Sequence, residues 1–390
     1  MERVSIAPRD RWQDKAEALG FGFHEMYGEP YWLDDAYYRF TMREIEDEVE
    51  APTEELHALC LALVDEVVAS EALLTRLAIP PAQFDTVRDA WRGSRRHLYG
   101  RFDLAYDGTG PAKLLEYNAD TPTAVFETGY FQYGWLTDQI ALGRLPRGAD
   151  QFNLLQESLV EAFAAFPADR IFHFAAVLDN EEDRGTATYL MDCAVQAGHP
   201  TRLIDVASIG VDAQGRFTDP HEQVIDRCFK LYPWEDMMRE PFAAFLPRSG
   251  TEWVEPAWKA ILSNKGMLPL LWERHPGHPN LLPAFFEDDP RAAELADHVR
   301  KPFHSREGEN VAIVEAGETR EVSEGAYGDG PAVVQGLTPL FRSRDEGGGE
   351  QYAVLGSWVV GDRACGLGMR EDRSRITRNL SRFVPHAIVD

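Results

Sequence analysis

The stretch that decides the fold is RFDLAYDGTGPAKLLEYNAD, residues 101–120. Apolar residues on both sides of a turn at residues 107–110 predict two antiparallel strands joined by that turn. Because successive side chains of a strand point to opposite faces, Glu116 and Asn118 lie on the same face of the second strand. Asp103 lies on the strand paired with it, so the sequence predicts a hairpin rich in oxygen-bearing side chains.

Three side chains of this hairpin form a candidate metal site, namely Asp103, Glu116 and Asn118. Mg²⁺ prefers hard oxygen ligands, usually one or two carboxylates together with water and substrate phosphates, and this trio supplies them. A solvated acidic hairpin face would contain the same residues, so that alternative stays open. Arg101 and Arg370 are candidates for holding a carboxylate or an acyl-phosphate, because a guanidinium fork matches two oxygens at once. Structural salt bridges are the alternative for both arginines.

Two lysines in the last third of the chain are candidates for binding nucleotide phosphates, Lys265 in SNKGMLPLLW and Lys301 in KPFHSREGENV. The segment after Lys301 supplies a short loop whose backbone amides could cover phosphates. Further candidates in this loop and in the later VVQG segment are Ser305, Arg306, Gly308 and Gln335. Neither GxxxxGK[ST] nor a GxGxxG that opens a helix is present, which disfavours a P-loop NTPase and a Rossmann dehydrogenase. Ordinary surface lysines are the alternative interpretation.

The first part of the chain is predicted to be largely helical outside the hairpin. Apolar residues at helical spacing predict a helix over 51–76 with Thr53 as its N-cap, and a second helix over 81–99. The same pattern predicts helices over 123–142 and 152–166.

The middle of the chain is predicted to form a parallel sheet. The apolar run IFHFAAVLD, residues 171–179, is predicted as a buried strand, and residues 183–197 as a helix. RLIDV and CFKLYPW follow as short strands. This alternation is typical of a βαβ layer with a mostly parallel sheet.

The last third is predicted to consist of one helix followed by strands. A helix is expected over 258–270, and from Lys301 onward four strands are separated by Gly-rich or charged turns. The strands are VAIVEAG, PAVVQGL, YAVLGSWVV and ACGLGMR. Their spacing predicts one antiparallel sheet.

Charge and composition exclude several partners. The chain has 390 residues and a formal net charge of −26 at pH 7. Such a charge repels nucleic acid and anionic membranes, so neither is expected as a partner, whereas cationic small molecules such as polyamines would be attracted. Solubility is the plainer reason for an acidic surface. The four scattered cysteines and the lack of a signal peptide or membrane span predict a cytoplasmic protein with reduced thiols.

Other groups are weaker candidates. His275 and His278 are each followed by a proline and have no evident third ligand, so no zinc site is expected there. None of the cysteines has an activating neighbour, so thiol catalysis is not expected. Residues 234–236, Trp-Glu-Asp, could line a pocket for a cationic substrate, with packing as the alternative.

Several separated segments of the chain, taken in order, resemble the glutathionylspermidine synthase family, above all its stand-alone, synthetase-like bacterial members. They are RFDLAYDGTGPAKLLEYNADTPT, KLYPWE, EPAWKAILSNKGMLPLLWERHPGHPNLLPA, KPFHSREGENV, VVQGLTPL and GSWVVGDRACGLGMREDRSRITRNLSRFVPH. The resemblance implies an α/β (α+β), ATP-grasp-like fold with an antiparallel sheet forming the ATP cleft and an additional α/β lobe. It implies one domain over 1–390, with sub-lobes over 1–150, 151–260 and 261–390.

The same resemblance implies an enzyme, an ATP- and Mg²⁺-dependent ligase that joins a carboxylate to an amine through an acyl-phosphate. Its implied substrates are small molecules, a glutathione-like peptide or an amino acid and an amine or polyamine. The implied roles are Mg²⁺ ligation by Asp103, Glu116 and Asn118, phosphate binding by Lys265 and Lys301, and acyl-phosphate binding by Arg101 and Arg370.

The resemblance leaves some choices open. Bifunctional members carry an N-terminal cysteine amidase domain for which this chain has no room, so amidase activity is not expected. A non-catalytic nucleotide-binding regulatory protein that keeps the fold is the main alternative, and a hydrolase of the conjugate is a second. The segment 305–310 is expected to act as a lid, while the substrates, the pathway and the oligomeric state stay open.

Overall fold

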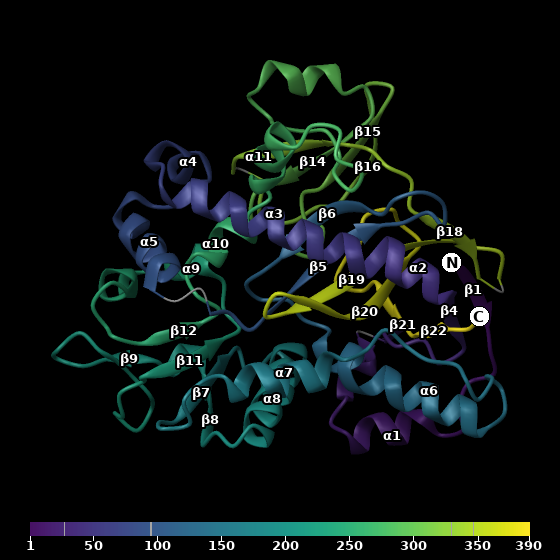
Figure 1. Ribbon diagram of the computed structural model, residues 1–390, viewed down its shortest axis with the longest axis horizontal. Helices are drawn as coiled ribbons and strands as arrows, with labels where there is room; N and C mark the ends of the chain where they lie inside the picture. Colours follow the sequence, from purple (N-terminus) through teal and green to yellow (C-terminus); the bar gives the residue numbers. More distant parts are fainter. Residues whose placement is uncertain (27, 94–95, 329, 346) are drawn as a thin grey trace.

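The computed structural model describes residues 1–26, 28–93, 96–328, 330–345 and 347–390. Its centre is an antiparallel sheet of six strands in the order β21–β20–β19–β5–β6, with β18 paired to β19 (Figure 1). The strands are β5 (Tyr99–Ala105), β6 (Lys113–Asn118), β18 (Phe341–Arg344), β19 (Glu350–Val360), β20 (Arg363–Asp372) and β21 (Arg382–Val384). The predicted hairpin is thus confirmed as β5 and β6, and its partners come from the end of the chain.

A second antiparallel sheet of five strands contacts β6, in the order β13–β17–β14–β15–β16. Its strands are β13 (Ala284–Phe286), β14 (His298–Pro302), β15 (Ala312–Glu315), β16 (Glu318–Val322) and β17 (Ala332–Gly336). The Gln335 side-chain amide donates to the carbonyl of Leu114 on β6 at 2.9 Å. The prediction of one sheet for the last third was wrong, because residues 337–340 carry the chain from β17 to the central sheet.

The predicted βαβ layer is confirmed as a parallel sheet of four strands in the order β12–β11–β7–β8. Its strands are β7 (Phe172–Ala176), β8 (Thr201–Asp205), β11 (Arg227–Lys230) and β12 (Glu252–Val254), and helices α7 (Leu155–Ala164) and α8 (Glu181–Gln196) accompany it (Figure 1). Every residue of β7 is buried. A strand covered on both faces is largely apolar, which explains why His173 is the one polar residue of β7.

The two ends of the chain meet in a three-stranded sheet, in the order β1–β4–β22. Its strands are β1 (Glu2–Ser5), β4 (Ala36–Phe40) and β22 (His386–Ile388). β22 runs parallel to β4, and Figure 1 shows the two termini on the same side of the molecule.

A long helical run covers the central sheet, and it begins earlier than predicted. It consists of α2 (Met42–Ile45), the π-helical turn η2 (Glu46–Glu50) and α3 (Ala51–Val68). Thr41 is its N-cap, because its side chain and that of Glu44 form a reciprocal capping box. The prediction of Thr53 as the cap was wrong, since Thr53 lies inside α3 and its hydroxyl donates to Ser357 Oγ at 2.7 Å.

Two other predicted helices have different limits. The first helix ends at Val68, and α4 (Glu71–Arg76) follows as a separate helix. The predicted helix over 81–99 is the short turn η3 (Pro81–Gln83) and α5 (Phe84–Gly93), while residues 94–95 lie outside the described part and Tyr99 already belongs to β5.

The predicted helix over 258–270 is two helices, α10 (Lys259–Leu262) and α11 (Met267–Arg274). Asn264 interrupts them, since its side-chain oxygen accepts from the amide of Gly266 at 2.8 Å and its amide donates to the carbonyl of Leu77 at 2.6 Å. An Asn side chain that satisfies nearby backbone groups in this way competes with the helix itself.

The predicted helix over 123–142 contains the π-helical turn η4 (Glu127–Phe131) and α6 (Gln132–Ala141). The remaining short elements are α1 (Trp12–Ala18), η1 (Gly22–His24), β2 (Glu25–Met26), β3 (Glu29–Pro30), η5 (Val206–Ser208), β9 (Gly210–Val211), β10 (Phe217–Thr218), α9 (Trp234–Met237), η6 (Pro241–Phe245) and η7 (Pro290–Glu294).

The core fixes the hairpin against α3. Leu56, Leu63 and Val64 of α3 belong to one apolar cluster with Leu355 and Leu367 of the central sheet, all at most 1% exposed. Each such side chain contributes about 1.5–3 kcal/mol by leaving water. All four cysteines are buried and free, as expected, and no helix in the described ranges has the length and apolar character needed to cross a membrane.

Candidate active site

The hairpin brings its oxygen-bearing side chains together. In the register of β5 and β6, Arg101 lies opposite Asn118 and Asp103 lies opposite Glu116. The Asn118 side-chain amide donates to Asp103 Oδ2 at 3.1 Å and to Glu116 Oε1 at 3.2 Å. The three candidate metal ligands therefore form one group, and a register slip of a single residue would turn one strand's members to the other face.

Cations neutralise both carboxylates of this group. The Arg101 guanidinium contacts Asp103 in two places, with Nε at 2.6 Å from Oδ1 and Nη2 at 3.0 Å from Oδ2. Lys265 Nζ lies 3.0 Å from Glu116 Oε2. Burial alone would raise the pKa of Glu116, but the charges of Lys265 and Lys301 lower the pKa below its usual range. Glu116 is accordingly an anion, as a metal ligand has to be.

Lys265 and Lys301 are not surface lysines, since each residue is only 7% exposed. Lys265 lies in the break between α10 and α11, and its ammonium donates to the carbonyl of Ser305 at 2.6 Å. Lys301 lies on β14 and donates to Gln335 Oε1 at 2.7 Å and to the carbonyl of Leu115 at 2.9 Å. Burial lowers the pKa of Lys301 to about 8. The two ammonium groups thus flank Glu116 inside the protein.

A cleft begins at these residues and extends between the five-stranded sheet and the central sheet. Its charged end contains Asp103, Glu116, Lys265 and Lys301. The rest of its lining is largely apolar and includes Val299, Val311, Ile313, Leu337, Leu340, Val354 and Ile376. Clefts with apolar walls and a few convergent polar groups are typical small-molecule sites. We call this the first cleft.

A second cleft opens on the other side of the hairpin carboxylates. It is lined by Arg101, Asn118, Arg306, Arg370, Asn180, Glu182, Asp183 and Glu307, among others. Four residues line both clefts, namely Asp103, Glu116, Gly308 and Thr377. Two of the three candidate metal ligands, Asp103 and Glu116, therefore lie where the two clefts meet, within reach of a molecule bound in either.

Two arginines of the second cleft are held by the protein. Arg306 donates to Thr121 Oγ1 at 2.6 Å and to Glu235 Oε1 at 2.7 Å, while its buried Nε has no partner among the residues that the structure describes. Arg370 donates from Nε to the carbonyl of Ser381 at 3.0 Å and from Nη2 to that of Asn379 at 3.1 Å. Arg306 was grouped with the phosphate-binding residues in the sequence, but the structure places it in the second cleft.

The loop that follows β14 packs closely on the segment near Thr377. Gly308 has a φ of +69°, and a Cβ added there would lie 2.4 Å from the carbonyl oxygen of Thr377. Only glycine fits this position, because it lacks the side chain and tolerates the left-handed conformation. Gly308 and Ser305 line the first cleft together with Gln335, as the sequence suggested.

No pattern in the sequence pointed to the acidic wall of the second cleft. Glu182 and Asp183 lie in the first turn of α8, which Asn180 caps. Acidic residues are common at helix N-termini because they complement the helix dipole, so this pair looked like an ordinary helix start. Burial, together with the charge of Glu182, raises the pKa of Asp183 to about 7.

Comparisons with known proteins show the family of the chain. The family described as "Glutathionylspermidine synthase preATP-grasp" matches residues 3–389. A Haemophilus influenzae protein named "Putative acid–amine ligase" is 37% identical, and the match covers all of both chains. Trypanothione synthetase of Crithidia fasciculata is 30% identical over 83% of this chain and 52% of its own length. The bifunctional glutathionylspermidine synthetase/amidase of Escherichia coli K12 is 26% identical over 97% of this chain and 64% of its own.

The chain therefore spans the whole of the first relative, about half of the second and somewhat under two thirds of the third. A solved glutathione synthetase-like effector from Globodera pallida aligns with a TM-score of 0.53 at 11% identity, over 90% of this chain and 89% of its own. This likeness shows that the fold is of the ATP-grasp type, as predicted. The family match and the relatives, all of them named as ligases or synthetases, together show that the chain belongs to the glutathionylspermidine synthase family of acid–amine ligases.

Proposed function

We propose that this protein is an ATP- and Mg²⁺-dependent ligase that joins the carboxylate of a peptide or amino acid to an amine or polyamine through an acyl-phosphate. The observation that carries the proposal is the meeting of two clefts at Asp103 and Glu116, beside two buried lysines. A ligase of this kind has to bring a triphosphate and a carboxylate to one point, and these clefts offer one such point.

ATP would occupy the first cleft. Its apolar walls suit the adenine ring, and Lys265 and Lys301 at the charged end would bind the phosphates as point charges. Gln335 holds the Lys301 ammonium in place. The loop amides near Gly308 would cover the phosphates from the side of the second cleft.

Mg²⁺ fits the donor set of the hairpin. The Asn118 side-chain nitrogen donates to both carboxylates, and a half-turn of that amide would bring its oxygen beside Asp103 and Glu116. Two carboxylates and one amide oxygen are ligands that Mg²⁺ takes together with phosphate oxygens and water. An ion held by Asp103, Glu116 and Asn118 would neutralise charge on the phosphates. In the structure, Arg101 and Lys265 provide the positive charge at the two carboxylates.

The reaction proceeds in two transfers. The substrate carboxylate attacks the γ-phosphorus of ATP, the bond to the bridging oxygen breaks, and ADP leaves. The amine nitrogen then attacks the carbonyl carbon of the acyl-phosphate, gives up a proton, and inorganic phosphate leaves. Arg101 and Arg370 line the second cleft and would stabilise the oxyanion and the departing phosphate, a contribution of roughly 3–4 kcal/mol for each donor.

The acidic wall of the second cleft favours a cationic amine. Glu182, Asp183 and Glu307 line it, and their carboxylates would attract an ammonium group. Such an amine has to lose a proton before it can attack. A pKa of about 7 makes Asp183 suited to accept that proton near neutral pH. A polyamine also carries further charges that this wall could bind.

Water has to be kept from the acyl-phosphate, because hydrolysis would waste ATP. The segment 305–310 joins β14 to β15 and borders both clefts through Gly308. We assign it the role of the lid that closes when substrates are bound.

The test is a screen of carboxylate and amine pairs for ADP formation with Mg²⁺–ATP. The wild type should release ADP only with a matched pair, and Asp103→Ala or Glu116→Ala should abolish the release while thermal unfolding shows an intact fold. Asp107→Asn, on the turn of the same hairpin, is the matched control and should keep full activity. ATP binding without ADP release for any pair would favour a non-catalytic regulatory protein, and unchanged turnover in Asp103→Ala would refute the metal assignment.

A further inference from the structure

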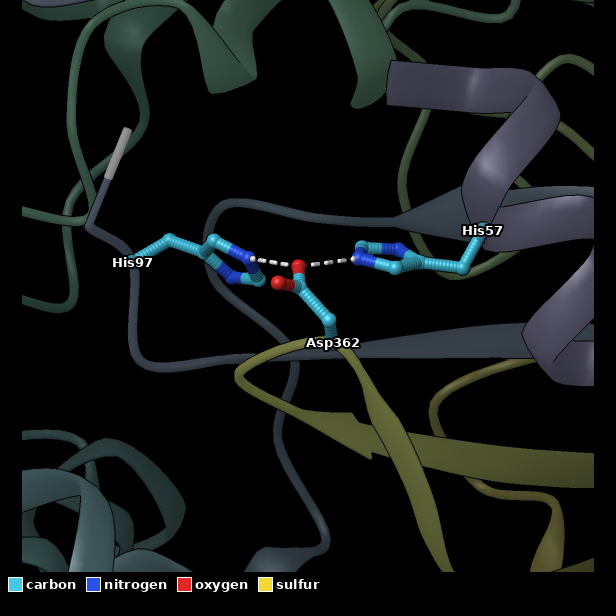
Figure 2. A group of neighbouring side chains, drawn as sticks. All are labelled: His57, His97 and Asp362. Carbon is cyan, nitrogen blue, oxygen red and sulfur yellow. Dashed lines mark hydrogen bonds and ion pairs between the residues drawn. The ribbon is translucent and has the colours of Figure 1, made fainter. Parts of the chain in front are cut away.

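Outside both clefts, three side chains from distant parts of the sequence point at one another. His57 comes from α3, His97 from the segment just before β5, and Asp362 from the turn between β19 and β20 (Figure 2). Each offers a metal-binding atom, and these three atoms lie within 4.8 Å of one another. His57 and His97 are buried, while the Asp362 side chain is 73% exposed.

We propose that His57, His97 and Asp362 form a binding site for one Zn²⁺ ion, separate from the proposed ATP site. Two imidazoles and one carboxylate are a ligand set that zinc accepts, whereas Mg²⁺ and Ca²⁺ prefer oxygen ligands alone. The exposure of Asp362 lets solvent reach the fourth position, which a water molecule would fill.

The distances match tetrahedral coordination. His57 Nε2 lies 3.2 Å and His97 Nε2 lies 3.1 Å from the same oxygen, Asp362 Oδ1. With bonds to zinc of about 2.0–2.1 Å, neighbouring ligand atoms of a tetrahedron are about 3.3 Å apart. Two of the three edges are thus already within a few tenths of an ångström of this value. The third edge, between the two histidine ligand atoms, is at most 4.8 Å and would have to shorten when the ion binds.

The surroundings of the two rings permit the required tautomers. The Tyr117 hydroxyl lies 3.2 Å from His57 Nδ1, so its oxygen can accept a hydrogen bond from the Nδ1–H group when Nε2 binds metal. Ligating histidines usually have such an outer partner, which orients the ring. His97 Nδ1 has no hydrogen-bond partner in the described part of the chain. No donor therefore opposes a proton on Nδ1 when Nε2 binds metal.

The nearest described lysine is already paired with a carboxylate. Among the residues that the structure describes, Lys259 is a cation whose charge acts on all three groups, and its ammonium is paired with Glu255 at 2.9 Å. The same ammonium donates to the carbonyl of Tyr99 at 2.7 Å. A divalent cation at the site would therefore be attracted by the Asp362 carboxylate, and the paired Lys259 ammonium would repel it little.

The site would act on structure rather than on the reacting atoms. None of its three residues lines either cleft. His97 precedes Arg101 by four residues, roughly 13 Å along a strand. Zn²⁺ would tie α3, the start of β5 and the β19–β20 turn together, and so hold the strand that carries Arg101 and Asp103.

The alternative is a turn anchored by hydrogen bonds, in which Asp362 accepts one N–H from each histidine. Asp362→Asn distinguishes the zinc site from the hydrogen-bonded turn, because the amide oxygen still accepts hydrogen bonds but is a poor zinc ligand. Asp288→Asn is the matched control, an exposed carboxylate that pairs with Arg76. Tyr117→Phe keeps the ring and removes only the outer partner.

The experiment is a titration of the chelator-treated full chain with Zn²⁺, followed by metal content and thermal unfolding. It is done in an Asp103→Asn, Glu116→Gln background, so that the hairpin carboxylates do not bind the ion. We expect one Zn²⁺ per chain and a higher unfolding temperature, since an ion that binds only the folded state stabilises that state.

Asp362→Asn should weaken the binding by about 100-fold or more and Tyr117→Phe by about 10–100-fold, while Asp288→Asn changes nothing. Co²⁺ should give the intense visible bands of a tetrahedral site in the parent and lose them in Asp362→Asn. Failure of the parent to bind Zn²⁺ would overturn the proposal, as would equal binding by Asp362→Asn. Far-UV circular dichroism checks that the variants are folded.

Discussion

Replacing Glu127 by Gln should change how the stability of this protein depends on pH. Glu127 lies in η4, is 1% exposed and accepts a hydrogen bond of 2.6 Å from the Tyr31 hydroxyl. Burial and the charge of Glu182 raise its pKa from 4.5 to about 7. The native state therefore holds this proton more tightly than the unfolded chain does.

The sign follows from that difference. Between about pH 4.5 and pH 7 the unfolded chain has lost the proton while the native state still binds it, so raising the pH through this window lowers the stability of the wild type. The shift is about 2.5 pH units, and at about 1.4 kcal/mol per unit the loss is at most about 3 kcal/mol. Glu127→Gln has no proton to lose, and its amide oxygen can still accept from Tyr31.

The assay is urea unfolding of both proteins at several pH values from 4.5 to 8. The variant should gain stability relative to the wild type as the pH rises, by up to about 3 kcal/mol, and the gain should level off above pH 7. Glu157→Gln, an exposed change on α7, is the control and should show no such trend. A difference between Glu127→Gln and wild type that does not vary with pH would refute the reasoning.

Three further predictions concern the two clefts. Lys301→Gln should weaken ATP binding at least about tenfold in calorimetry, and affinity equal to the wild type would contradict phosphate binding by Lys301. In the wild type, ATP affinity should fall as the pH rises through about 8, where the Lys301 pKa lies. Arg101→Lys keeps the charge but loses the two-point fork, so turnover should drop about 100-fold with ATP binding unchanged; equal kcat values would argue against its role. Gly308→Ala should lower stability by about 1–3 kcal/mol because of its contact with Thr377, whereas Gly317→Ala, also at positive φ but in open space, should cost less in thermal unfolding.

Local patterns predicted the hairpin and the parallel sheet well. In a strand, side chains two residues apart share a face, so Glu116 and Asn118 had to lie together once the strand existed. In the parallel sheet, burial on both faces leaves a largely apolar run such as residues 172–176, interrupted by His173. In both cases the information lies within a short window of sequence.

Features that depend on distant partners could not be predicted in this way. The break between α10 and α11 depends on the Asn264 side chain bonding to the carbonyl of Leu77, which is far away in the sequence. The acidic wall near Asp183 resembles any helix N-terminus until the fold places it beside Arg306 and Arg370. The alternation of strands in the last third says nothing about which sheet each strand joins.

The pairing of β5 with β19 has a consequence for folding during synthesis on the ribosome. The hairpin leaves the ribosome first, and more than two hundred residues must follow before β19 (Glu350–Val360) can cover its open edge. Contacts across such long stretches form slowly, and an uncovered strand edge invites pairing with other chains in the meantime. Nascent chains halted before Glu350 should therefore depend on chaperones, whereas full-length chains can close the sheet by themselves.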